Sequence, residues 1–470
     1  MFHRLNYMYE TFIEPLYGIK RDLATDEELL SSNTLPHMYC ISDERVDMTM
    51  HDIYSIDPDG CQDADDAFSI FIENSTLYLA IHIADPTEYI NIDSALWKDI
   101  EKRIVTRYPS SKPPIHMMPH QIMEQSSLIV NQYGCIKFAI TILTEIHQTT
   151  YEPIGIIKLL FTTVRVKKEN ALSYKRAGEL IDTNPTITTC LKISHSLIAR
   201  RSEKTKGTVL NEVSYSFPRY NTNTGMMYLH TDAKPEIQMK QMIAEFAIFA
   251  NSFIGYYLNV NFDGFGIYRI CSARDWLDTI HVEISGKELL NEIIVNGIKA
   301  EYISTVESHD LVGAAEYTHF TSPIRRLSDC VCHYLLKYIH LKKINPDIKV
   351  PFSNEKLKIY SNDCMRVNKM MKNIQYKDHK FRFIQTMNNM LLVYPSITIC
   401  YYISSYTGLF LNIIIHKIND YFVYISYTLR IPQLIISFAQ KEDRYLTITR
   451  VNYTTEYDEG SIPELDAVFI

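Results

Sequence analysis

An aspartate-rich turn between two apolar segments is the part of the sequence best suited to chemistry. The segment Ser55–Phe68 reads SIDPDGCQDADDAF and contains five aspartates. Carboxylates this close together repel one another, so they must either stay solvated or bind a cation. Hard oxygen donors favour Mg²⁺ or Mn²⁺. The candidate metal ligands are Asp57, Asp63, Asp65 and Asp66.

Three other interpretations of this turn can be compared with the Mg²⁺ or Mn²⁺ site. A calcium loop is excluded, because the turn lacks the D-x-[DN]-x-[DN]-G order and the glutamate at position twelve. A zinc site would need sulfur and nitrogen ligands at characteristic spacings, which the turn does not offer. An acidic surface turn stays open, since spacing alone does not distinguish it from a metal site.

A second segment, Tyr317–Asp329, reads YTHFTSPIRRLSD and resembles a helix start. Ser322 is a suitable N-cap and Pro323 a suitable first-turn residue. We therefore predict that a helix begins here and points its free backbone N–H groups outward. Such a helix end favours a phosphate.

The basic side chains of this second segment strengthen the phosphate interpretation. Arg325 and Arg326 carry fork-shaped donors suited to phosphate oxygens, and His319 lies nearby in the sequence. For Arg326, an ion pair with Asp329 is an equally good interpretation.

The elements that must position these groups include a strand-rich region over residues 54–92. The runs Phe68–Glu73 and Leu77–Ala84 are predicted to form a hairpin, which would place His82 and Asp85 near the aspartates. His82 then either orients a metal ligand or is a packed polar residue of the sheet. The second interpretation is favoured.

Two helices are predicted beside this sheet. Residues 98–108 are charged and helical in pattern, and they end in RIVTRY, which supplies Arg103 and Tyr108. An aromatic ring beside a cation can stack on a base while the cation holds phosphate. Residues 239–259 are apolar at helical spacing, so Glu245 inside this helix needs a partner. An arginine is the ordinary partner.

A basic stretch over residues 158–206 has two interpretations. A solvated helix face is favoured, and a basic wall that leads RNA inward is the alternative.

These segments follow one another as they do in the ribonuclease II (RNB) family, which the sequence resembles. Residues 55–68 are similar to the family signature T-I-D-P-x-x-x-x-D-x-D-D-A. Five further segments match family patterns in order: YLAIHIADPTEYI (Tyr78–Ile90), RIVTRYPSS (Arg103–Ser111), ALSYKRAGELI (Ala171–Ile181), MIAEFAIFAN (Met242–Asn251) and HDLVGAAEYTHFTSPIRRLSD (His309–Asp329). A single aspartate motif can arise by chance, but this ordered series does not.

The resemblance implies a fold and an activity. The fold would be α+β, with an RNB-type catalytic domain of mixed sheet and surrounding helices and a small C-terminal OB-like β-barrel. The activity would be metal-dependent 3′-to-5′ hydrolysis of single-stranded RNA to nucleoside 5′-monophosphates, with Mg²⁺ (or Mn²⁺) as cofactor. RNA would enter through a channel that leads to the aspartates.

The resemblance also implies roles for individual residues. Asp65 and Arg325 would be catalytic, with Arg325 on the phosphate. Glu245 would contact the metal surroundings or the 3′ nucleotide, as an alternative to its arginine pair. The residues expected to contact RNA are Tyr108, Arg103, His319, Ser322 and Arg326.

The sequence departs from the family pattern at single positions and at its N-terminus. Leu311 replaces a glycine and Leu327 a tyrosine, for which we expect altered packing with activity kept. Tyr376 falls roughly at a glutamate position, where we expect a fine-tuning contact to be missing. Residues 1–50 leave no room for the two cold-shock-type barrels of the family, each on the order of 60–70 residues. The expected domains are 1–50 (a short N-terminal segment), 51–395 (catalytic) and 396–470 (OB-like).

The C-terminal region is predicted to contain five short strands, SITICYYIS, LFLNIIIHKI, YFVYISYTL, QLIISFA and YLTITRV, which suit a small barrel. Five Lys/Arg residues against eight acids give weak support for RNA binding there. Packing against the catalytic domain or a partner is the alternative.

Composition and charge indicate how the protein can bind RNA and in which compartment it works. The net charge of −8 and the pI of about 6.1 mean that RNA must be bound by a local basic surface. The nine cysteines are scattered without C-x-x-C pairs, which favours a reducing compartment. No apolar run is long enough for a membrane helix. We expect a cytoplasmic protein, with the nucleus as the alternative, that binds single-stranded RNA and no membrane; the sequence leaves its protein partners open.

Three functions are consistent with these observations. The first is the exoribonuclease. The second is a catalytically inactive RNA-binding or scaffold protein on the RNB fold, which the four retained aspartates disfavour. The third is a nuclease that acts on DNA by the same metal chemistry.

Overall fold

The structure, a computed structural model, describes most of the chain. The described residues are 9–11, 13–18, 25–205, 216–279, 293, 297–407, 410–419, 421–430, 442–449, 452–453 and 465–466. Within these residues, no helix is both long enough and apolar enough to cross a membrane.

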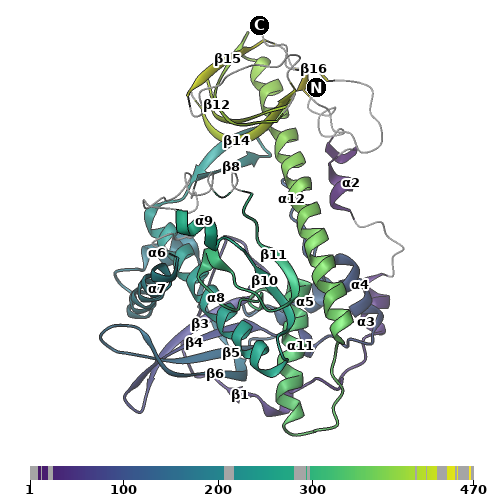
Figure 1. The fold of residues 1–470 in the computed structure, drawn as a ribbon, viewed down its shortest axis with the longest axis vertical. Coiled ribbons are helices and arrows are strands. Elements are labelled where there is room, and N and C mark those ends of the chain that lie inside the picture. Colours follow the sequence, from purple (N-terminus) through teal and green to yellow (C-terminus); the bar gives the residue numbers. More distant parts are fainter. Residues whose placement is uncertain are drawn as a thin grey trace.

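A seven-stranded mixed sheet carries the aspartate turn (Figure 1). Its strand order is β1-β6-β5-β4-β3-β2-β7, with parallel pairs at the two edges and antiparallel pairs between them. The strands are β1 (Val46–Asp47), β2 (Ile53–Asp57), β3 (Asp66–Glu73), β4 (Thr76–Ala84), β5 (Lys137–Ile146), β6 (Pro153–Val164) and β7 (Val166–Ser173). The predicted hairpin is confirmed: β3 and β4 pair along their whole length, from Asp66 opposite Ile83 to Glu73 opposite Thr76.

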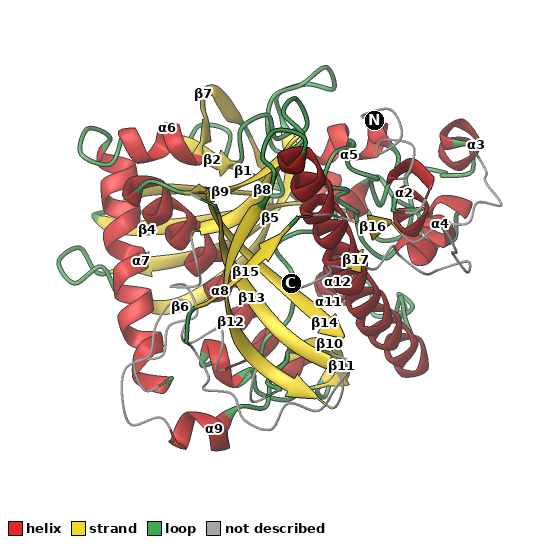
Figure 2. Ribbon diagram, turned by 90° about the horizontal axis from the view of Figure 1, so that it is seen from above, coloured by secondary structure: helices red, strands yellow, loops and turns green. Residues whose placement is uncertain are grey.

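Helices pack around this sheet (Figures 1 and 2). The longest, α12, runs past the sheet toward the C-terminal strands. The α-helices are α2 (Glu14–Tyr17), α3 (Asp26–Ser31), α4 (Ala95–Arg103), α5 (His120–Ser126), α6 (Tyr174–Glu179), α7 (Pro185–Lys204), α8 (Lys234–Asn261), α9 (Arg274–Thr279), α11 (Leu327–Lys342) and α12 (Asn354–Leu391). Short 3₁₀ turns occur at η1 (Ser42–Glu44), η2 (Pro86–Glu88) and η4 (Asp310–Val312). The fold is thus mixed α+β, as predicted.

The helix predicted over residues 239–259 exists as the longer α8. It continues through Gly255, where an added Cβ would lie 2.8 Å from the backbone nitrogen of Tyr317. Glycine is therefore needed here for close approach of two backbones. The helix is not buried on every side, because Tyr256 and Val260 are exposed.

The helix predicted over residues 98–108 is too long at its C-terminal end. Helix α4 ends at Arg103, and Ile104 adopts a left-handed φ of 66°. The chain then runs extended, and Val105 forms a β-bridge with Arg326. Pairing with a distant segment, which local sequence does not reveal, replaces the last helical turn.

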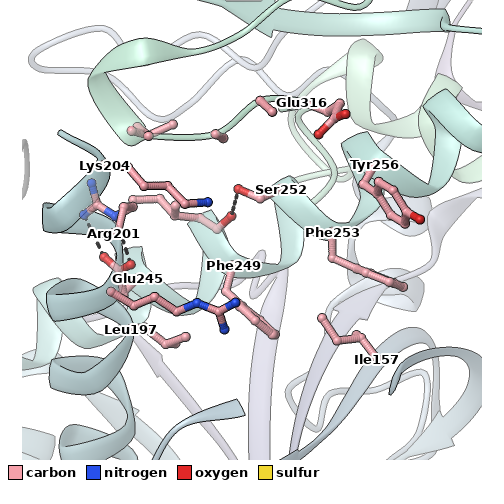
Figure 3. A pocket seen from close by; sticks show the side chains of 16 residues that line it. Ile157, Leu197, Arg201, Lys204, Glu245, Phe249, Ser252, Phe253, Tyr256 and Glu316 are labelled. Carbon is pink, nitrogen blue, oxygen red and sulfur yellow. Dashed lines mark hydrogen bonds and ion pairs between the residues drawn. The ribbon is translucent and has the colours of Figure 1, made fainter. Parts of the chain in front are cut away.

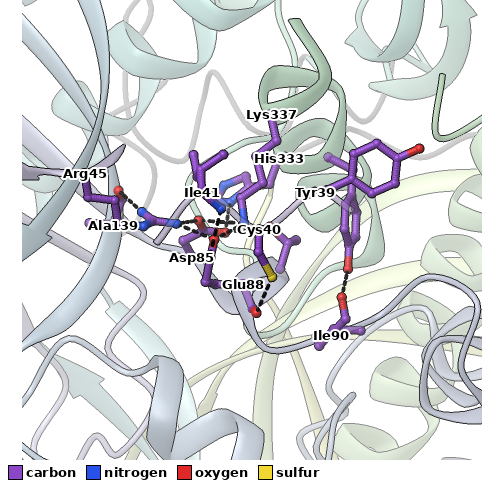
Figure 4. A network of polar contacts seen from close by, with 12 residues as sticks. Tyr39, Cys40, Ile41, Arg45, Asp85, Glu88, Ile90, Ala139, His333 and Lys337 are labelled. Carbon is purple, nitrogen blue, oxygen red and sulfur yellow. Dashed lines mark hydrogen bonds and ion pairs between the residues drawn. The ribbon is translucent and has the colours of Figure 1, made fainter. Parts of the chain in front are cut away.

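A buried ion network ties the N-terminal segment to the sheet and to α11 (Figure 4). The guanidinium of Arg45 lies 2.5 Å from Asp85 and 2.7 Å from Glu88. The ammonium of Lys337 lies 3.0 Å from Asp85 and 2.7 Å from Glu88. The hairpin does bring Asp85 next to the aspartate turn in the backbone, because the N–H of Ala84 donates to the carbonyl of Asp65 at 2.8 Å, but the side chain of Asp85 binds these cations.

Removing one cation from this network should be costly. Replacing Lys337 by methionine leaves two buried carboxylates with a single guanidinium, and breaking a buried ion group in this way costs about 3–5 kcal/mol. We expect urea unfolding to show that loss in the free energy of unfolding. The exposed Lys343, replaced by methionine as a control, should change it by less than about 0.5 kcal/mol. Equal effects of the two substitutions would contradict a stabilising role for the network.

Four smaller sheets complete the part of the fold that the structure describes. The C-terminal sheet has the order β14-β13-β12-β15 and its own apolar core, shared with the end of α12. The remaining strands are β8 (Ser216–Asn221), β9 (Met226–Thr231), β10 (Phe265–Ile270), β11 (Glu301–Thr305), β12 (Ile397–Thr407), β13 (Phe410–Ile418), β14 (Tyr421–Arg430), β15 (Arg444–Ile448), β16 (Asn452–Tyr453) and β17 (Leu465–Asp466). The predicted strand QLIISFA lies outside the described residues.

Candidate active site

The four candidate aspartates lie where β2 ends and β3 begins. Asp57 is the last residue of β2 and Asp66 the first of β3, and the turn between them carries Asp63 and Asp65. Asp57 accepts a hydrogen bond from Ser55, and Asp63 accepts one from the thiol of Cys61. The carboxylates thus lie at the same end of two neighbouring strands, where β2 ends and β3 begins.

Arg325 reaches this turn from a segment 260 residues away in the sequence. Its Nε atom lies 3.0 Å from Oδ2 of Asp65, while the backbone N–H of Ile324 donates to Oδ1 at 2.8 Å. Asp65 is 4% exposed, whereas the side chain of Arg325 is 43% exposed. The guanidinium therefore holds the buried acid on one side and faces solvent on the other.

The helix predicted to begin at Ser322 is wrong in its start. Helix α11 begins at Leu327, with Arg326 as its N-cap residue. Residues before it form a turn whose backbone bonds to the strand-like segment after α4: Thr106 donates to the carbonyl of Arg325, and Leu327 to that of Ile104. The backbone N–H of Ile324 donates to Asp65, so this turn uses a backbone donor to position a carboxylate of the protein.

Burial and mutual repulsion raise the pKa values of the acids. Burial raises the pKa of Asp65 to about 7, although Arg325 opposes the shift. Burial, together with the charges of Asp57 and Asp65, raises the pKa of Asp66 to about 8. Burial and the charge of Asp63 also raise the pKa of Asp57. The four acids therefore act on one another electrostatically.

This excess of negative charge fits a divalent cation. The donors are all carboxylate oxygens, which Mg²⁺ and Mn²⁺ prefer, and a cation would relieve the repulsion that raises the pKa values. The described residues contain one group of three potential ligands whose atoms all lie within 4.8 Å of one another, and the aspartates are not in that group. The carboxylates would therefore have to move closer together around a single ion.

Two tyrosines face the cluster. Tyr108 is 43% exposed; partial burial raises its pKa to about 12, while Arg325 lowers it and Asp63 raises it. Tyr174, the first residue of α6, was not predicted as a site residue; burial and the charges of Asp66 and Asp57 raise its pKa. Its signal was the L-S-Y sequence at a helix start, whose Ser173 is the N-cap.

The loop that carries Tyr108 is fixed by α12. The carboxylate of Asp378 accepts bonds from the backbone N–H and the hydroxyl of Ser110 at 3.0 and 2.6 Å. Arg382 donates to Ser110 at 3.0 Å and also to Ser111. The exposed ring of Tyr108 therefore projects from an anchored loop beside Arg325.

The other residues expected to contact RNA have partners within the protein. Arg103 pairs with Asp99 at 2.5 Å and donates to the carbonyl of His116. Arg326 pairs with the buried Asp329 at 2.8 Å, which is the ion pair weighed for it above. These contacts account for both guanidiniums structurally.

His319 and Ser322 are placed differently. The Nδ1 atom of His319 lies 2.6 Å from the hydroxyl of Tyr302. The hydroxyl of Ser322 accepts a bond from Arg325 at 2.9 Å, so Ser322 helps to orient the guanidinium.

His82 is a packed residue of the sheet, the favoured interpretation. Its ring nitrogens lie 3.0 Å from Ser69 and 2.9 Å from Thr141, and burial lowers its pKa to about 3. No contact joins it to the aspartates among the described residues.

The stability of the fold should therefore depend on His82 in acid. Between pH 6.5 and 3 the unfolded chain binds a proton at this position that the folded chain does not. Its contribution to the free energy of unfolding is thus complete above pH 6.5 and is lost as the pH falls toward 3. Going from pH 7 to 5 should cost the wild type about 2 kcal/mol more than His82→Gln in urea unfolding. His147→Gln, at an exposed histidine, should behave as the wild type does; equal pH slopes for the wild type and His82→Gln would refute this.

Glu245 is paired with arginine rather than with the aspartates. Its carboxylate binds Nε and Nη2 of Arg201 at 3.0 and 2.8 Å. The pair borders a cavity of about 470 Å³ between α7, α8 and the segment 312–316 (Figure 3). Arg200 and Lys204, from the predicted basic stretch, also line this cavity. The cavity beside Asp66 holds only about 10 Å³, so the RNA channel stays a prediction.

The chain is similar to known proteins in sequence and in fold. A sequence model of the RNB domain family matches residues 45–342. Exoribonuclease 2 of Buchnera aphidicola subsp. Acyrthosiphon pisum is 29% identical over 383 residues, which cover 72% of this chain and 56% of that protein. The chain thus spans about half the length of this relative.

Two solved structures have a similar fold. RNase R of Mycoplasma genitalium, in complex with double-stranded RNA, superposes with a TM-score of 0.69 at 16% identity, over 96% of this chain and 81% of that one. Yeast Ssd1, described as a pseudonuclease, superposes with a TM-score of 0.59 at 18% identity, over 82% of this chain and 50% of that one. At these identities the likeness shows the fold.

Proposed function

Since this chain belongs to the RNB domain family, we propose that it is a metal-dependent exoribonuclease that hydrolyses single-stranded RNA from the 3′ end to nucleoside 5′-monophosphates. The observation that carries the proposal is the contact between Arg325 and Asp65. It joins the aspartate turn to the arginine segment from the other end of the matched region, and it leaves the guanidinium partly exposed beside four acids.

The aspartates would hold Mg²⁺ or Mn²⁺. When bound, such an ion lowers the pKa of an attacking water and offsets charge on the scissile phosphate. Asp57, Asp63, Asp65 and Asp66 would supply its oxygen ligands. No side-chain nucleophile is needed for this chemistry.

The remaining groups act on the substrate. Arg325 would donate to a non-bridging phosphate oxygen from its exposed face while Asp65 fixes its Nε. Ser322 and the turn around Ile324 keep the guanidinium in that orientation. Tyr108 would stack on a base next to the phosphate being cleaved.

End-labelled RNA tests this function directly. A single-stranded oligoribonucleotide labelled at its 5′ end should shorten progressively with Mg²⁺, whereas the same RNA labelled at its 3′ end should release labelled mononucleotide at once. EDTA should abolish both reactions, and the DNA version should persist. RNA that is retained without shortening would instead establish an RNA-binding scaffold, and cleavage of the DNA would establish the third candidate.

Tyr108→Ala should weaken RNA binding. Loss of one stacked base costs about 1–3 kcal/mol, which is roughly 5- to 150-fold in Kd. Tyr108→Phe keeps the ring and should bind RNA nearly as the wild type does. Fluorescence anisotropy with labelled RNA in EDTA measures binding without turnover. An unchanged Kd for Tyr108→Ala would rule out stacking at this position.

We also infer that the C-terminal strands form a module of the OB type. The antiparallel order β14-β13-β12-β15 and the separate apolar core support this inference. Its excess of acidic residues makes packing on the catalytic domain as suitable a role as RNA binding.

A further inference from the structure

Three side chains with metal-binding atoms meet on the C-terminal sheet, far from the aspartate turn in the fold (Figure 1). Cys400 lies on β12, His416 on β13, and Asp443 directly precedes β15. A ligand atom from each lies within 4.8 Å of the other two, and no other described trio does so. Two strands and the residue that leads into a third therefore converge on one point.

The backbone is shaped to bring His416 to this point. Cys400 pairs with Lys417 and Tyr401 pairs with Ile415, so His416 is the extra residue of a β-bulge. The pairing of β13 with β14 shifts at the same place. In a regular strand, neighbouring side chains face opposite sides of the sheet, whereas a bulge re-aims the extra one. The irregularity thus directs the imidazole toward the side of the thiol.

The side chains already interact across the strands. The Nε2 atom of His416 lies 3.0 Å from Oδ1 of Asp443, and the imidazole lies 6.1 Å from the ring of Tyr402. Cys400 is buried, His416 half-buried and Asp443 exposed. The trio therefore has a buried end at Cys400 and an open side toward solvent at Asp443, through which an ion can enter.

The three donors specify the class of metal. A thiolate and an imidazole are soft or borderline ligands, so the trio suits Zn²⁺ better than Mg²⁺ or Ca²⁺. Thiolate, imidazole and carboxylate fill three positions of a tetrahedron and leave the fourth to water. This donor set differs in kind from the all-carboxylate turn between β2 and β3.

We propose that Cys400, His416 and Asp443 form a Zn²⁺ site that fastens the start of β15 to β12 and β13. In the order β14-β13-β12-β15, strand β15 lies at the sheet edge and is joined to β12 by backbone pairing. A metal bond to Asp443, directly before β15, would anchor the start of β15 to the neighbouring strands. The zinc ion replaces the thiol proton of Cys400, which leaves to solvent, and the neutral imidazole binds the ion through one ring nitrogen while its proton stays on the other; binding therefore strengthens as the pH rises.

Cobalt titration of the full chain tests the proposal. Co²⁺ bound to a thiolate gives a near-ultraviolet charge-transfer band, so we expect one equivalent to produce this band and Zn²⁺ to abolish it. Cys400→Ser should remove the band. Cys61→Ser is the matched control, because Cys61 is the thiol beside the aspartate turn, and it should retain the band.

A second variant protects the test against misfolding. Asp443 is exposed, so Asp443→Asn should fold normally while weakening Co²⁺ binding by at least about tenfold. Zn²⁺ should raise the melting temperature of the wild type and raise that of Asp443→Asn less. The proposal is overturned if no thiolate band appears, if the band depends on Cys61, or if Asp443→Asn binds Co²⁺ as tightly as the wild type.

Discussion

Replacing Asp65 by asparagine is expected to lower the rate of RNA hydrolysis by roughly 10³-fold, about 4 kcal/mol of barrier, with RNA affinity nearly unchanged. The substitution preserves shape but exchanges one carboxylate oxygen for an NH₂ group. Oδ1 can still accept the N–H of Ile324, whereas an amide nitrogen facing Nε of Arg325 cannot accept a bond from it. A cation ligand and the anchor of the arginine are lost together.

The turn itself supplies the matched control for this substitution. Asp59 is the fifth aspartate of the turn and is exposed. Asp59→Asn removes the same charge from the same loop, so it should leave the single-turnover rate within about twofold of the wild type. If both variants lose activity equally, the effect belongs to the overall negative charge, and a specific role for Asp65 is wrong.

The second large effect is expected at Arg325. Arg325→Lys keeps the positive charge but loses the fork that spans Asp65, Ser322 and a phosphate. Loss of one preorganised donor costs about 10²–10³ in kcat. Arg366, an exposed arginine on α12 paired with Asp363, provides the control, and Arg366→Lys should retain full activity.

Cation binding separates two roles of Arg325. If the guanidinium acts on the phosphate, Arg325→Lys lowers kcat while the concentration of Mn²⁺ that gives half-maximal rate stays the same. If it serves only to hold Asp65, that concentration rises along with the loss of rate. Because the two side chains are in contact, the double variant Asp65→Asn/Arg325→Lys should lose less than the product of the two single losses.

The sequence predicted the fold and the site best where the local residue pattern itself reveals the role that a segment has in the folded protein. The alternation of apolar residues predicted the β3/β4 hairpin, and the aspartate spacing selected a turn that the structure places at the end of β2. Glu245 was expected to need an arginine inside an apolar helix, and Arg201 provides it. In each case the need for the interaction is visible in the local sequence, although the partner can lie further away, as Arg201 lies 44 positions from Glu245.

Long-range pairing is where prediction from the sequence failed. The Ser322-Pro323 start and the end of α4 both look helical locally, but the two segments pair with each other, and Ile324 is drawn to Asp65. The partner of Asp85 was missed for the same reason, since Lys337 lies 252 positions further along the chain and only the packed fold brings them together. Backbone groups satisfied by distant segments leave no periodic trace in the sequence.

Tyr174 shows a different limit. Thirty-three tyrosines give no compositional reason to select one. The L-S-Y sequence marked a helix start, and the fold was needed to show that the first residue of α6 faces Asp57 and Asp66. Conversely, Arg103 looked accessible beside Tyr108 but is engaged by Asp99. Side-chain partners decide whether a charge is available to a substrate.

Sulfur substitution at the scissile phosphate most directly tests whether the aspartates and Arg325 hold a metal ion on that phosphate. Sulfur binds Mg²⁺ poorly and binds softer ions such as Mn²⁺ or Cd²⁺ better. With an oligoribonucleotide carrying sulfur at its last 3′ linkage, we predict slow hydrolysis in Mg²⁺ and recovery in Mn²⁺ or Cd²⁺ for one of the two diastereomers, in the wild type and Asp59→Asn. Equally slow hydrolysis of both diastereomers in every metal, or hydrolysis that persists in EDTA, would contradict the account.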